Sequence, residues 1–64
     1  MGLYVTVELH QGLVDNVNVF FSRQGAKEEE GRWIARNNID TSVDREALAK
    51  NGNEFRVFET KPKP

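Results

Sequence analysis

Residues 3–21 read LYVTVELHQGLVDNVNVFF. Apolar residues occupy every second position from Leu3 to Leu9, and the alternation returns from Val17 to Phe21. A period of two with β-branched residues is typical of a strand with one buried side. Two such runs around a glycine predict a β-hairpin, and this is the strongest signal in the chain.

The loop of this hairpin determines which side chains share a face, because a shift of one residue turns every side chain to the other side. A two-residue loop at Gln11–Gly12 would separate the valines of the first strand from those of the second. A three-residue loop, His10–Gly12 with Gly12 in the left-handed conformation, keeps them together and pairs Leu9 with Leu13. We therefore predict the longer loop, with a bulge near Asp15 that turns its side chain outward.

This register assigns the apolar positions of the hairpin to the side that packs against helices. These core positions are Leu3, Val5, Val7, Leu9, Leu13, Val17, Val19 and Phe21. The outer side carries Tyr4, Thr6, Glu8, His10, Asn16, Asn18 and Phe20. Tyr4 and Phe20 lie close together there, either as an aromatic pair that covers the sheet or as a platform for a partner.

Two helices are predicted between residues 22 and 53, where the alternation stops. Ser22 is a suitable N-cap for the first, which we expect to start near Gly25 or Ala26 and to stop at Asn37–Asn38. Residues 40–42 offer N-caps for the second helix, and Asn51–Gly52 is typical of a helix end because glycine tolerates the left-handed conformation.

Residues 54–60 return to a strand pattern. Phe55 and Val57 are expected to face the helices, and Arg56 and Phe58 to face outward. The resulting order is β-β-α-α-β, an α+β fold with a three-stranded, mainly antiparallel sheet in spatial order 2-1-3 and two helices on one face. Residues 1–60 would form one domain, followed by a mobile tail at residues 61–64.

Composition limits the class of protein. A chain of 64 residues without cysteine is near the lower size limit for a self-supporting core, so either the monomer is marginally stable or a second copy adds core. Nine Lys and Arg against ten Asp and Glu give no global basic field for nucleic acid. Without a membrane-spanning apolar run or a signal-peptide pattern, we expect a cytoplasmic protein.

The sequence offers no recognisable catalytic, metal or cofactor motif. It has one histidine, no cysteine and no glycine-rich phosphate loop. The run Glu28–Glu30 reads as a solvated helix start, because consecutive helical residues point in different directions. We therefore expect a protein that is not an enzyme and needs no metal or cofactor.

Arginine beside aromatic residues is the composition of protein–protein hot spots and of single-stranded nucleic-acid platforms. Arg32 and Arg36 flank Trp33 on the first helix and could form an ion ladder with Glu28. If Trp33 is instead the largest core anchor, these arginines are only solvated. The last strand and the hairpin offer a second group on the outer sheet face, which could also be a dimer interface.

The candidate partner-binding residues are Tyr4, Phe20, Arg32, Arg36, Arg56 and Phe58. From them we predict a protein-interaction or regulatory module whose partner is another protein or a second copy of itself. The alternative is a weak nucleic-acid binder that uses the arginines with the sheet aromatics. No membrane partner is expected.

Overall fold

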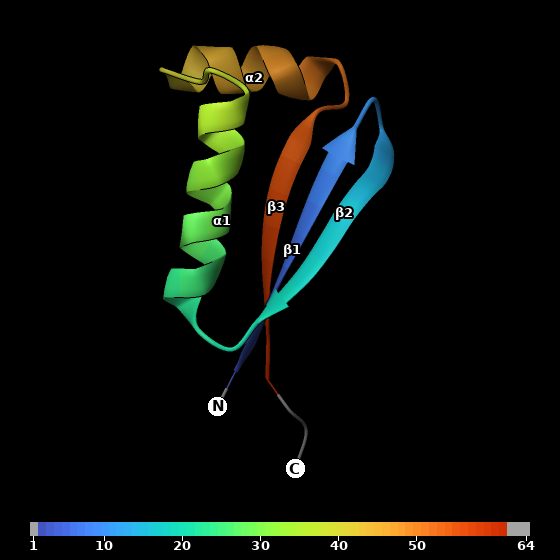
Figure 1. Ribbon diagram of the computed structural model, residues 1–64. Helices are drawn as coiled ribbons and strands as arrows, with labels where there is room; N and C mark the ends of the chain where they lie inside the picture. Colours follow the sequence, from blue (N-terminus) through green and yellow to red (C-terminus); the bar gives the residue numbers. More distant parts are fainter. Residues whose placement is uncertain (1, 62–64) are drawn as a thin grey trace.

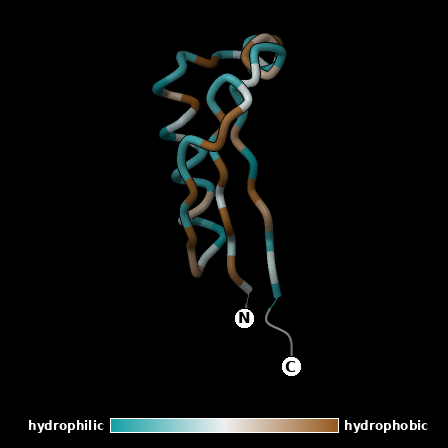
Figure 2. Tube along the Cα trace, turned by 90° about the vertical axis from the view of Figure 1, so that its right-hand side faces the viewer, coloured by the Kyte–Doolittle hydropathy of each residue, from teal (hydrophilic) through white to brown (hydrophobic). Residues whose placement is uncertain are grey.

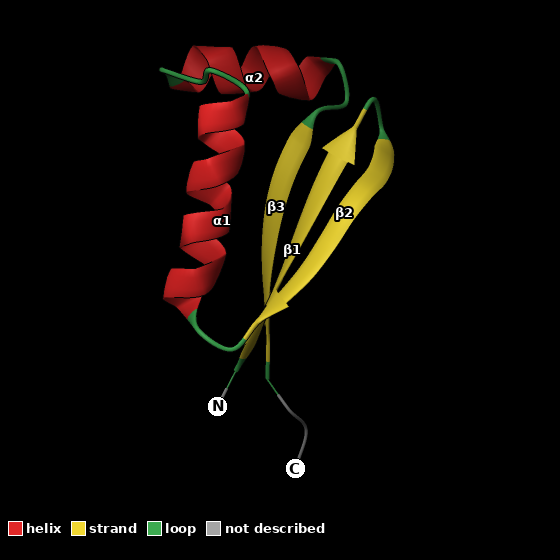
Figure 3. Ribbon diagram, viewed as in Figure 1, coloured by secondary structure: helices red, strands yellow, loops and turns green. Residues whose placement is uncertain are grey.

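The computed structural model describes residues 2–61 and contains five elements in the order β-β-α-α-β (Figure 1). The strands are β1 (Leu3–His10), β2 (Leu13–Phe20) and β3 (Glu54–Thr60), and the helices are α1 (Arg23–Arg36) and α2 (Ser42–Lys50). The sheet is antiparallel in the order β2-β1-β3 (Figure 3), which confirms the predicted α+β class. Beyond Lys61, the predicted tail lies outside the described residues.

The hairpin closes through a two-residue turn, Gln11–Gly12, whose φ angles are +51° and +82°. Two positive φ angles define the type I′ turn, which matches the twist of the flanking strands. The pairing shifts between Glu8 and Leu9, so that Asp15 becomes the extra residue of a bulge. The predicted three-residue loop is therefore wrong, but the bulge near Asp15 is present and returns the valines of both strands to a common face.

Helix α1 covers the side of the hairpin opposite to the one predicted to face the helices, while α2 contacts the sheet only at β3. Thr6, in the middle of β1, is only 1% exposed. Phe20 lies against the first turn of α1, where a Cβ on Gly25 would come within 3.0 Å of its ring. The even-numbered residues of β1 pair with Phe55 and Val57, which face the helices as predicted. The alternating valines and leucines of β1 therefore face away from the helices, and their assignment to the core is wrong.

The core is small. Its buried apolar side chains within residues 2–61 are Ala26, Trp33 and Phe55. The rings of Trp33 and Phe55 have their centroids 5.6 Å apart, and the guanidinium carbon of Arg45 lies 5.2 Å from the centre of the Trp33 ring. Trp33 is 3% exposed, so it is a core anchor and not a surface residue.

Side chains at its two ends define α1. Ser22 is the N-cap, and its hydroxyl accepts a hydrogen bond of 3.1 Å from the backbone N–H of Gly25. This confirms the predicted cap, although the helix starts at Arg23, before the expected position. The C-cap is Asn37, and Asn38 follows with a φ of +53°, which confirms the predicted stop.

Helix α2 lies across the end of α1 and leads into β3 beside the hairpin turn (Figure 1). Thr41 and Asp44 form a reciprocal capping box at its start, and Asn51 is its C-cap. Gly52 follows with a φ of +80°, as the Asn-Gly signal predicts. The N–H of Gly12 donates to the carbonyl of Gly52 over 2.9 Å, which ties the hairpin turn to the connection between α2 and β3.

Candidate interaction surface

Neither helix covers the other side of the sheet. Because side chains alternate along a strand, residues from all three strands lie on this uncovered side. They are Leu3, Val5, Val7 and Leu9 of β1, Val14, Val17 and Val19 of β2, and Glu54, Arg56, Phe58 and Thr60 of β3. We call these residues the open sheet face. The alternation of hydrophobic and hydrophilic residues along the strands is visible in Figure 2.

The centre of the open sheet face is apolar. Val19, Val5 and Phe58 form a row across the three strands, because Val5 is opposite both of the others. Val19 is 56% exposed, Phe58 48% and Val17, in the next row, 52%. Single exposed apolar residues are ordinary, but a contiguous patch over three strands marks an interaction site.

The charge on the open sheet face is confined to one edge and is balanced. Of the residues that define it, Glu54 and Arg56 are the charged ones, and both lie on β3. Their side chains form an ion pair with a nitrogen–oxygen distance of 3.2 Å. The face therefore combines an apolar centre with a neutral polar edge.

Tyr4 and Phe20 do not belong to this surface. They lie opposite each other on β1 and β2, as predicted for a cross-strand pair, but on the side that the helices cover. The hydroxyl of Tyr4 donates to a carboxylate oxygen of Glu59 over 3.4 Å. The predicted single patch of Tyr4, Phe20 and Phe58 therefore does not form, while Arg56 and Phe58 lie together on the open sheet face.

Arg32 and Arg36 project from α1, on the opposite side of the sheet from Arg56. Arg32 pairs with Glu29 at 2.9 Å instead of with Glu28 as predicted. Arg36 pairs with Glu8 of β1 at 2.6 Å and so connects the helix to the sheet. Trp33 is buried between α1 and β3, so no exposed aromatic lies between these arginines. The predicted interaction group of Arg32 and Arg36 around Trp33 therefore does not form.

The valines of the open sheet face are interaction candidates that the sequence did not identify. The alternation assigned them to the core, where apolar residues usually lie. The signal that separates the two sides is the pairing of β3, because Phe55 and Val57 supply the helix-facing apolar surface. An antiparallel register that pairs them with Glu8 and Thr6 leaves the β1 valines on the other side.

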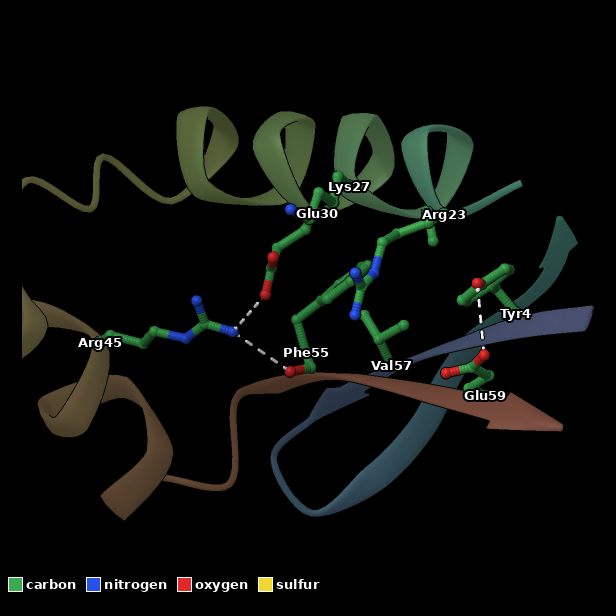
Figure 4. Close-up of a pocket in the computed structure, with 9 residues that line it drawn as sticks. Tyr4, Arg23, Lys27, Glu30, Arg45, Phe55, Val57 and Glu59 are labelled. Carbon is green, nitrogen blue, oxygen red and sulfur yellow. Dashed lines mark hydrogen bonds and ion pairs between the residues drawn. The ribbon is translucent and has the colours of Figure 1, made fainter. Parts of the chain in front are cut away.

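A cleft of about 490 Å³ lies on the helix side, between α1 and β3 (Figure 4). Its lining consists of Tyr4, Arg23, Ala26, Lys27, Glu30, Arg45, Phe55, Val57 and Glu59. Arg23 reaches from α1 toward Val57, while Arg45 pairs with Glu30 at 2.8 Å at the other end. Cationic side chains thus line the cleft at both ends, and Phe55 and Val57 supply its apolar strand surface.

Among residues 2–61, no group of three or more His, Cys, Asp or Glu side chains is placed to hold a metal ion. His10 is exposed at the end of β1. No helix in the described part of the chain combines the length and apolar character needed to cross a membrane.

No family model, curated protein or solved structure matches this chain.

Proposed function

We propose that this chain is a small, non-enzymatic protein-interaction module that acts as a homodimer, with two open sheet faces packed against each other. The observation that carries the proposal is the apolar row of Val19, Val5 and Phe58 across the three strands, in which Val19 and Phe58 are about half exposed on either side of Val5. Stacked sheets pack about 10 Å apart through interdigitating side chains, which suits branched residues such as valine.

The small core supports a second layer on this face. Within the described residues only Ala26, Trp33 and Phe55 are buried apolar side chains, fewer than a domain of this size usually needs. Packing another sheet on the open side would turn Val17, Val19 and Phe58 into core residues without changing the fold. A dimer would thus complete the two-layer arrangement that folded domains adopt.

The dimensions of the face are sufficient for a modest dimer. Three strands about 4.8 Å apart and about 3.3 Å per residue along seven residues give a surface about 14 Å by 23 Å. With side-chain relief, two such surfaces would bury on the order of 1,000 Å² in total, which is at the lower end of specific interfaces. We therefore expect a dimer that dissociates on dilution.

The charge pattern favours a second copy as the occupant. A symmetric dimer brings the same surface of each subunit together, so a face with excess charge would repel its own copy. Glu54 and Arg56 cancel each other at 3.2 Å, and the remaining residues of the face are neutral. Nothing on this surface opposes contact with itself.

The alternative, nucleic-acid binding, has weaker support. Arg32, Arg36 and Arg56 each pair with a glutamate, and they lie on two sides of the sheet. Phosphate contacts need positive charge that is free to replace counterions. We keep a cytoplasmic location as the prediction from the cysteine-free composition.

Sedimentation velocity over a concentration series tests the proposal. We expect the mass to rise from one copy to two copies with concentration in the wild-type protein. Val19→Lys places a charge at the centre of the open sheet face and should leave a monomer at every concentration. Val43→Lys is the matched control, because Val43 is an exposed valine on α2 and lies outside the face.

Three results would overturn the homodimer proposal. One is a wild-type monomer at all concentrations, and another is a dimer that Val19→Lys leaves unchanged. The third is a loss of dimer in Val43→Lys equal to that in Val19→Lys. Circular dichroism of each variant establishes that it is folded. Binding of a single-stranded oligonucleotide that falls steeply with salt would favour the alternative instead.

A further inference from the structure

We propose that the cleft between α1 and β3 binds a small organic anion, in which a phosphate or carboxylate group is joined to a flat apolar ring. The cleft lies on the helix side of the sheet, so this inference does not depend on the homodimer. Its volume of about 490 Å³ is within the range of pockets that hold small molecules.

Two cationic side chains of α1 line the cleft. Arg23 is the first residue of α1 and Lys27 follows four positions later, so the two lie on one side of the helix and both line the cleft. The first turn of α1 contains no acidic residue. The N-terminal end of a helix already carries partial positive charge, and cations there raise the local positive potential at a cost in stability. A bound anion would remove that cost.

An apolar strand surface lies across the cleft from these cations. Phe55 and Val57 of β3 line the cleft, and Val57 is a large apolar residue with substantial exposure although its side chain faces α1. Figure 4 shows the guanidinium of Arg23 reaching from α1 toward these two side chains. A ring that covers Val57 would therefore place its anionic substituent close to Arg23.

The two carboxylates in the lining already have partners. Glu30 pairs with Arg45 at 2.8 Å, and Arg45 also donates to the carbonyl of Phe55 over 3.3 Å. Glu59 accepts a hydrogen bond from the hydroxyl of Tyr4. Three cations against two carboxylates leave the cleft with an excess of positive charge, and Arg23 and Lys27 supply it.

A titration followed by ¹⁵N–¹H correlation spectra tests this inference, with phenyl phosphate and benzoate as the probes. We expect saturable shifts of the amides around Arg23, Lys27 and Val57. Phenol lacks the anion and inorganic phosphate lacks the ring, so each should bind at least tenfold more weakly than phenyl phosphate. Tighter binding of benzoate than of phenyl phosphate would identify a carboxylate as the preferred group.

The double variant Arg23→Gln, Lys27→Gln should weaken binding of the preferred probe at least tenfold. Arg32→Gln is the matched control on the same helix, because Arg32 pairs with Glu29 and does not line the cleft. The inference is overturned if neither probe gives saturable shifts, if the shifts centre on the open sheet face, or if the double variant binds as the wild type does. Val19→Lys should bind normally, which separates this inference from the homodimer proposal.

Discussion

Val5 and Phe58 lie directly opposite each other on β1 and β3, on the side of the sheet that neither helix covers. Val19 is opposite Val5 on its other side and completes an apolar row across the full width of the sheet. This row is the geometric centre of the proposed dimer. The residues that matter most for association in an interface lie near its centre.

Phe58→Ala should therefore weaken self-association at least tenfold. The ring is about half exposed in the single chain, so its removal should change the stability of the monomer less than that of the dimer. Val57→Ala is the comparison, because Val57 is the adjacent residue on the other side of the same strand. Sedimentation equilibrium measures both dissociation constants, and equal losses in the two variants would contradict the assignment of faces.

Trp33→Ala should unfold most of the protein at room temperature. Trp33 contacts Phe55 and Arg45 and is the largest of the few buried apolar side chains. Removing a buried aromatic side chain costs about 3–5 kcal/mol, which is comparable to the whole stability of a small domain. Circular dichroism with urea gives the free energy of unfolding. Trp33→Phe should retain the fold with a smaller loss, and a folded Trp33→Ala protein would contradict this view of the core.

Two glycines should respond in opposite directions to alanine. A Cβ on Gly52 would clash with the backbone amide nitrogen of Gly12, and the φ of +80° at Gly52 strains any residue that has a side chain. Gly52→Ala should therefore lower the free energy of unfolding by more than about 1 kcal/mol. Gly31 lies on α1 with nothing within 4 Å of the added Cβ, so Gly31→Ala should raise the free energy of unfolding by about 0.5–1 kcal/mol. Thermal unfolding of both variants checks the opposite signs.

Thr41→Ala should lower stability by about 1 kcal/mol, because it removes one half of the capping box of α2. The hydroxyl of Thr41 accepts from the N–H of Asp44 at 3.3 Å, and the carboxylate of Asp44 accepts from the N–H of Thr41 at 3.2 Å. Ser42→Ala, at the first helical position, should have little effect. Urea unfolding curves give the free energy of unfolding of each variant. Equal losses of stability in Thr41→Ala and Ser42→Ala would contradict the assignment of Thr41 as the N-cap.

Local signals in the sequence predicted the elements well. Ser22 and the Asn-Gly pair at residues 51–52 cap helices through their own side chains or backbone angles. Such contacts lie within a few residues, so the sequence pattern contains them. The prediction of the hairpin loop was wrong because two local solutions place the valines of both strands on one face. These are a three-residue loop and a type I′ turn followed by a bulge at Asp15.

The side covered by the helices could not be predicted in the same way. Strand β3 joins β1 only after two helices, so no turn determines the register that pairs Thr6 with Val57. A shift of one residue in that pairing would have placed the β1 valines in the core. The ion pair between Glu8 and Arg36, 28 positions apart, likewise depends on the final packing. Which side of the sheet the helices cover is thus determined by tertiary structure.

The most direct test of the homodimer is an isotope-filtered NOE experiment on a mixture of ¹³C-labelled and unlabelled chains. Its signals report only contacts between different copies. We predict intermolecular NOEs from the methyl groups of Val17 and Val19 and from the ring of Phe58. Intermolecular NOEs confined to the helix side, or none at a concentration where sedimentation shows two copies, would contradict the packing of two open sheet faces.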